Sequence, residues 1–77
     1  MEKSTRQKAI KYIHNYLGAI RKGETFYGLI LADYVKERLG KRDMYPATIL
    51  RYMRTLKADG EVNFEVESKR ESKYIKL

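Results

Sequence analysis

The stretch at residues 46–62, PATILRYMRTLKADGEV, constrains the fold more than any other part of the chain. Pro46 suits the first position of a helix, where its missing N–H costs no hydrogen bond. The apolar residues that follow share one face of that helix: Ile49, Tyr52, Met53 and Leu56. Gly60 suits the left-handed turn that ends a helix, and alternating apolar and polar residues follow it. The sequence therefore predicts a helix over 46–59 that passes directly into a strand.

The opposite face of the predicted helix combines small, hydroxyl and basic side chains. At about 100° per residue, five residues share this face: Ala47, Arg51, Arg54, Thr55 and Ala58. Two arginines at these positions are expected to be exposed to solvent. Either they only solvate an outer surface, or they bind a ligand that needs small and basic groups together.

Two earlier helices are predicted by apolar residues three and four positions apart. The first begins at Ser4 or Thr5 and ends with basic residues before Gly23; its inward residues are Ile10, Ile13, Leu17 and Ile20. The second spans about 28–39 and ends at Gly40; its inward residues are Leu31, Ala32, Val35 and Leu39.

Three segments favour strands. Residues 24–27 form either a short strand or a tight connection. Residues 61–67 alternate, with one side formed by Val62, Phe64 and Val66. After the polar turn at 68–72, residues 73–77 place Ile75 and Leu77 on one face. Two alternating runs joined by a short polar link predict an antiparallel hairpin.

The length of the chain, 77 residues, indicates one domain over 1–77 with a small core, because such domains bury only about 60% of their unfolded surface. Repeats, low-complexity segments and linkers are absent from the sequence. There is no apolar stretch of signal-peptide length and none near the roughly 20 residues of a membrane span. We therefore expect no membrane association and a cytoplasmic protein, associated with the nucleoid in a prokaryote.

The sequence carries few groups suited to catalysis or metal binding. It has no cysteine, which excludes disulfides and thiolate metal sites. Its one histidine, His14, has no second histidine to share a metal, and no nucleophile stands beside a base. We expect no enzymatic activity, no metal and no cofactor.

The formal net charge is +7, and it is unevenly distributed. Residues 1–23 carry +5 and residues 46–60 carry +2, whereas basic and acidic groups cancel in the other two parts of the chain. Uneven positive charge is typical of proteins that bind polyanions. Solubility alone is the other interpretation.

The order helix, short strand, helix, helix, hairpin resembles the winged helix-turn-helix family over about residues 5–77. The residues that carry the resemblance are Leu31-Ala32, then Thr48-Ile49, Met53, Leu56 and Gly60-Glu61-Val62. The connection between the second and third helices is longer than the tight turn of the simplest helix-turn-helix proteins. The resemblance implies an α+β domain of three helices with a C-terminal β-hairpin as the wing.

For function, the sequence predicts binding to specific sites on double-stranded DNA, as in a small transcriptional regulator. The major groove of B-DNA is about 12 Å wide and admits one helix, here 46–59. The residues expected to meet DNA are Tyr45 just before the helix, then Ala47, Thr48, Arg51, Arg54 and Thr55 in the helix, with Lys41 and Arg42 in the preceding turn. By resemblance, the wing at 62–77 would follow the backbone or the minor groove through Lys69, Arg70 and Lys73. Nearby acids oppose a stronger wing contact: Glu65, Glu67 and Glu71.

Two other parts of the sequence, in the second and the first helix, could contact a partner. Leu29 and Ile30 fall outside the inward stripe of the second helix, and we expect them to pack inside the domain. If they do not, they form a contact patch for another protein or for a second copy of the chain, as in a homodimer. The chain would then be a winged-helix protein–protein interaction module; RNA binding is a third, weaker option. The basic side of the first helix either adds DNA backbone contacts or is simply solvated: Lys3, Arg6, Lys8 and Lys11.

Overall fold

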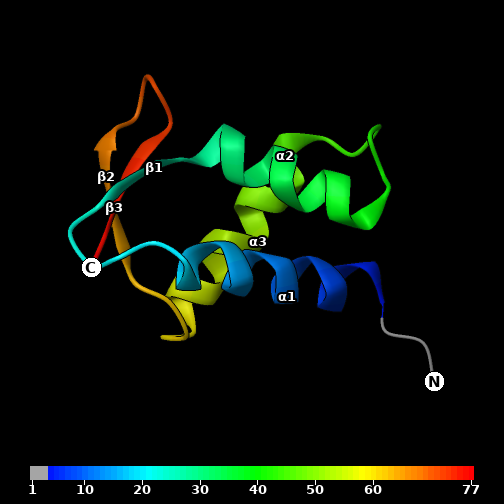
Figure 1. The fold of residues 1–77 in the computed structure, drawn as a ribbon, viewed down its shortest axis with the longest axis horizontal. Helices are drawn as coiled ribbons and strands as arrows, with labels where there is room; N and C mark the ends of the chain where they lie inside the picture. The colour runs from blue at the N-terminus through cyan, green and yellow to red at the C-terminus, as the bar shows by residue number, and fades with distance from the viewer. Residues whose placement is uncertain (1–3) are drawn as a thin grey trace.

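The computed structural model describes residues 4–77, which form three helices and one three-stranded antiparallel sheet (Figure 1). In chain order the elements are α1 Thr5–Gly18, β1 Thr25–Tyr27, α2 Gly28–Leu39, α3 Pro46–Ala58, β2 Phe64–Ser68 and β3 Lys73–Lys76. The fold is α+β, and the predicted order of elements is confirmed. No helix in residues 4–77 has the length and apolar character needed to cross a membrane.

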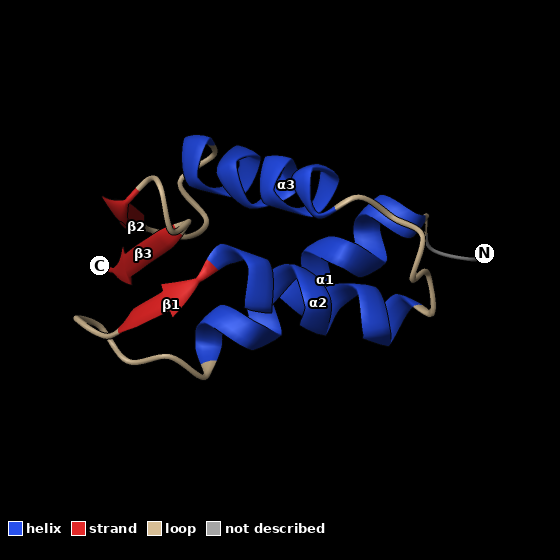
Figure 2. Ribbon diagram, turned by 90° about the horizontal axis from the view of Figure 1, so that it is seen from above, coloured by secondary structure: helices blue, strands red, loops and turns tan. Residues whose placement is uncertain are grey.

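The three helices enclose most of the core. Figure 2 shows α3 along one side of the molecule, with α1 and α2 on the other. Their fully buried side chains meet between these layers: Ala9, Ile13, Leu31, Ala32, Val35, Ile49 and Met53. The apolar faces predicted for α2 and α3 are largely confirmed, although Leu39 and Tyr52 are only half-buried.

The sheet has the strand order β1-β3-β2, so β3 is central. The hairpin of β2 and β3 is confirmed. Residue Tyr74 on β3 pairs with Phe26 on one side and with Val66 on the other. Tyr74 is buried, with its ring centroid 5.4 Å from those of Phe26 and Phe64. These three rings, all from the strands, form the part of the core that the sheet contributes.

The alternating pattern of the hairpin left open which face of its second strand points inward. Ile75 and Leu77 were predicted to share one face; Ile75 is half-buried on the face opposite Tyr74, and Leu77 is exposed. Tyr74 takes the inward position because β1 pairs with β3 and brings Phe26 against it. On β2 only Phe64 is buried: Val62 lies before the strand, and Val66 lies beyond the edge of the core with 57% of its surface exposed.

The ends of α1 explain its length. Ser4 forms a capping box, in which its hydroxyl accepts from the Gln7 N–H and its own N–H donates to the Gln7 side chain. The helix ends at Gly18, earlier than the predicted Gly23, and Ile20 lies outside it. The last turn holds no basic residue of its own. Gly23 instead serves the turn into β1, with a φ of 90°.

A lysine from the far end of the chain completes this helix end. The half-buried Lys76 ammonium donates to the carbonyls of Leu17 and Ile20, at 2.6 Å each. A cation beside the free carbonyls of a helix C-terminus also interacts favourably with the helix dipole. Lys76 therefore joins β3 to α1.

Replacing this lysine by methionine should destabilise the fold. Lys76→Met keeps most of the apolar stem but leaves both carbonyls without the ammonium. We expect the free energy of unfolding to fall by about 1–2 kcal/mol. Urea denaturation followed by circular dichroism measures the change, and unchanged stability would mean that water replaces the ammonium without loss.

The start of α2 departs from the prediction in one respect. Leu29 and Ile30 were expected to pack inside the domain, but they are 52% and 55% exposed. The strand β1 runs directly into α2, and the packed side of the helix is set by Leu31, Ala32 and Val35. The two preceding residues therefore point outward, next to the partly exposed Tyr27.

Candidate nucleic-acid interface

The helix α3 is fixed in place by three buried side chains, Ile49, Met53 and Leu56. Pro46 opens the helix, as predicted, and Tyr45 is the N-cap residue but makes no capping hydrogen bond with its side chain. The first turn contains no acidic residue. Pro46 has no N–H and the Thr48 N–H donates to the Tyr45 carbonyl at 3.0 Å, and no capping side chain or first-turn carboxylate is bound at this helix end.

The opposite side of α3 is open to solvent. Ala47, Arg51, Arg54 and Ala58 are all exposed, as expected from their spacing. Neither guanidinium group forms an ion pair with any carboxylate in residues 4–77. The two arginines are therefore held on a rigid helix with their charges uncompensated by a close acidic neighbour.

The two threonines of α3 are less accessible than expected. Thr48 and Thr55 are both half-buried. The Thr55 hydroxyl donates to the Arg51 carbonyl at 3.0 Å, a bond within the helix itself. This bond occupies the Thr55 hydroxyl proton, so the role of Thr55 as a hydrogen-bond donor to a ligand is weakened.

The connection before α3 presents one aromatic and two basic side chains. Tyr45 is 78% exposed, and Lys41 and Arg42 are also exposed. Arg42 shares a hollow of about 340 Å³ with Lys36 and with Asp33 and Glu37. The two carboxylates offset the two cations there, so Lys41 is better placed than Arg42 to meet an anion.

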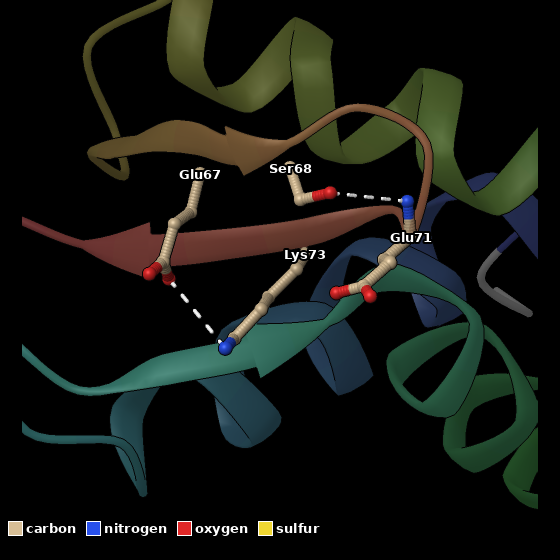
Figure 3. Close-up of polar contacts among 4 residues, drawn as sticks. All are labelled: Glu67, Ser68, Glu71 and Lys73. Carbon is tan, nitrogen blue, oxygen red and sulfur yellow. Dashed lines mark hydrogen bonds and ion pairs between the residues drawn. The ribbon is translucent and has the colours of Figure 1, made fainter.

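The turn between β2 and β3 carries Lys69 and Arg70, both exposed. Lys73 behaves differently, because it is half-buried at the start of β3. Its ammonium lies 4.0 Å from a Glu67 carboxylate oxygen (Figure 3). The same ammonium lies 5.8 Å from the centre of the Tyr27 ring. Lys73 is thus already engaged within the sheet, unlike the two residues of the turn.

Two of the three acidic residues of the hairpin lie away from the face near α3, whereas Glu71 is exposed in the turn itself. Glu65 pairs with Ile75, which faces away from the buried Tyr74, so Glu65 lies on the outer face of the sheet. Glu67 lies at an irregularity in β2 and reaches toward Lys73, across β3 in Figure 3. The repulsion expected from these two acids therefore acts mainly on the outer face.

A groove joins α3 to the hairpin on the other face. It has a volume of about 420 Å³ and is lined by Arg54, Lys57, Phe64, Val66, Lys69 and Tyr74. We call it the α3–β2 groove. It brings together Arg54 and Lys69, two residues predicted separately from the helix and the turn.

Lys57 was not among the predicted site residues. It is exposed, and its ammonium lies 5.1 Å from the centre of the Phe64 ring. It follows Arg54 by three positions, so the two residues share a side of the helix. That spacing was visible in the sequence, but the position of β2 beside it was not.

The basic side of α1 lies apart from this groove. Lys8 and Lys11 are exposed, and the Arg6 guanidinium lies 5.9 Å from the centre of the Tyr52 ring. Lys3 falls outside the described residues. This side of α1 therefore adds positive charge without lining the α3–β2 groove.

Tyr16, which lies outside the α3–β2 groove, has a shifted pKa. Burial raises the pKa of the Tyr16 hydroxyl, whose ring packs 5.3 Å from that of Tyr34. A tyrosine that is harder to ionise suits this packed contact between α1 and α2. Within residues 4–77, no three His, Cys, Asp or Glu side chains gather as a metal site would require.

Comparison of the chain with protein-family models, curated proteins and solved structures finds no match.

Proposed function

We propose that the chain is a winged-helix domain that binds specific sites on double-stranded DNA, as a small transcriptional regulator does. The observation that carries this proposal is the exposed side of α3, where Arg51 and Arg54 stand beside small residues with no ion pair in residues 4–77. In the proposed complex α3 lies in the major groove, and the turn at Lys69 and Arg70 contacts the sugar–phosphate backbone.

The chemistry of this helix face fits base edges. The planar guanidinium of arginine donates two parallel hydrogen bonds, which match O6 and N7 of guanine. Ala47 and Ala58 are exposed and small, so they allow the helix backbone to approach the groove closely. The start of α3 carries the positive end of the helix dipole and no acidic residue in its first turn, which favours a phosphate close to it.

Selection from randomised duplexes tests the proposal. The protein should enrich a defined sequence over several rounds, and the symmetry of that sequence reports whether one copy or a homodimer binds. Affinity for the selected duplex should fall steeply with salt, with a slope of about −0.9 for each phosphate contact in a plot of log affinity against log salt. If binding occurs without enrichment of any sequence, the protein contacts only phosphates. Failure to retain duplexes even at low salt would refute DNA binding.

The exposed residues at the start of α2 favour a second candidate function. Leu29, Ile30 and Tyr27 are exposed and close together in the chain, and they form a small apolar patch. In this alternative the chain is a protein–protein interaction module, and the patch meets another protein or a second copy. The charge of α3 would then serve solubility.

A further inference from the structure

The α3–β2 groove combines two kinds of surface that no single function above uses together. Three cationic side chains form its rim: Arg54, Lys57 and Lys69. Its floor is apolar, and it is formed by Phe64, Val66 and Tyr74. We propose that the groove binds an acidic segment of another protein through carboxylates on the rim and one bulky apolar side chain on the floor.

Val66 is the most exposed apolar residue of the floor. It is 57% exposed, whereas its neighbours Phe64 and Tyr74 are 2% and 8% exposed. An apolar residue on a strand next to a groove loses contact with water when a ligand covers it, which favours binding. The other two residues of the floor, Phe64 and Tyr74, are buried and packed edge to face, so this part of the floor is formed before any ligand arrives.

The rim determines the charge of the partner. None of its three cations forms an ion pair in residues 4–77. The Lys57 ammonium lies above Phe64, so this cation stands directly beside the apolar floor. Glu65 and Glu67 lie toward the outer face of the sheet and leave the rim positive. A partner with carboxylates on both sides of an apolar residue is complementary to this arrangement.

An acidic peptide uses more of the groove than DNA does. A phosphate backbone would meet the cations of the rim but would offer no bulky apolar group to the floor. Because Arg54 also belongs to the proposed DNA-binding face, an occupied groove would exclude DNA from that part of α3. This regulatory consequence rests on the proposed function; the binding of the peptide does not.

The test uses two short fluorescein-labelled peptides of aspartate and glutamate, one with a central phenylalanine and one with serine there. Fluorescence anisotropy at low salt is measured with the intact chain. The phenylalanine peptide should bind about fivefold more tightly, because only its side chain covers the floor. Val66→Ser should remove this difference. Lys57→Gln should weaken both peptides about threefold, whereas Lys22→Gln, an equal loss of charge at an exposed residue away from the groove, should change neither.

The outcomes separate peptide binding in the groove from DNA binding by α3. Equal affinity for the two peptides would overturn the inference, because charge alone would then explain binding. A phenylalanine preference that survives Val66→Ser would place the anchor elsewhere and also overturn it. If selected duplex DNA binds but neither peptide does, the inference fails and the proposed function stands. If the phenylalanine peptide binds as expected but no duplex does, the groove is retained and DNA binding fails.

Discussion

Gly28→Ala is expected to lower the free energy of unfolding by about 1–3 kcal/mol, because the position has no room for a methyl group. Gly28 is buried at the start of α2, and its N–H donates to the Ser72 carbonyl at 2.7 Å. A Cβ there would lie 2.8 Å from Cε2 of Tyr74, 2.9 Å from Cδ2 of Leu50 and 3.0 Å from the Ser72 Oγ. Tyr74 cannot easily move aside, because its ring is stacked on Phe26.

Gly18→Ala is the matched control. Gly18 is the last residue of α1, and a Cβ there would meet nothing within 4 Å. Alanine favours helix over glycine by up to about 1 kcal/mol, so this variant should be as stable as the parent or more stable. Urea denaturation of both variants measures the difference. Equal stability of the two variants would contradict the packing described for Gly28.

Arg51→Ala is expected to weaken binding to the selected duplex by about 1–3 kcal/mol and to relax the preference at one base pair. The reason is that Arg51 is exposed in the first half of α3, and the N-terminal part of a recognition helix contacts base edges in the major groove. A selection repeated with the variant measures the change in preference, and anisotropy measures the change in affinity.

Lys22→Ala serves as the control for charge in this experiment. Lys22 is exposed in the connection between α1 and β1, so its loss removes one positive charge without touching α3. It should leave the sequence preference intact. If Arg51→Ala instead weakens binding equally on every duplex, Arg51 contacts a phosphate and does not read a base.

The sequence predicted the helices well, because local signals determine them. Gly40 ends α2 and Pro46 begins α3, and the spacing of the buried residues within each helix gives its extent. The C-terminus of α1 was predicted less well. The basic residues before Gly23 suggested a longer helix, but the cation at that helix end comes from Lys76.

The inward face of β3 could not be predicted from the hairpin alone. The alternation in residues 73–77 is compatible with either face of the strand, and Ile75 and Leu77 are the more apolar set. Pairing of β1 with β3 decides the matter, since it places Phe26 against Tyr74. Such a pairing joins residues far apart in the chain, so it cannot be predicted from a local sequence pattern.

The exposed side of α3 was predicted from helical spacing, and its exposure is confirmed for Arg51 and Arg54. The groove was not predicted, because Lys57 lines it only through the position of β2. Lys73 and Thr55 were expected to be free for a ligand. The contact of Lys73 with Glu67 depends on the strand register, and the bond from Thr55 to the Arg51 carbonyl depends on the side-chain rotamer. The spacing of residues in the sequence shows neither.

The most direct measurement of the central claim is an NMR titration of the ¹⁵N-labelled chain with random-sequence duplex DNA at low salt. The proposed function predicts that the largest shifts fall in residues 45–58 and 68–73, with little change elsewhere. If these resonances stay in place, while those of residues 27–34 shift as the protein concentration rises, α3 does not bind DNA and the apolar patch at the start of α2 is the functional surface.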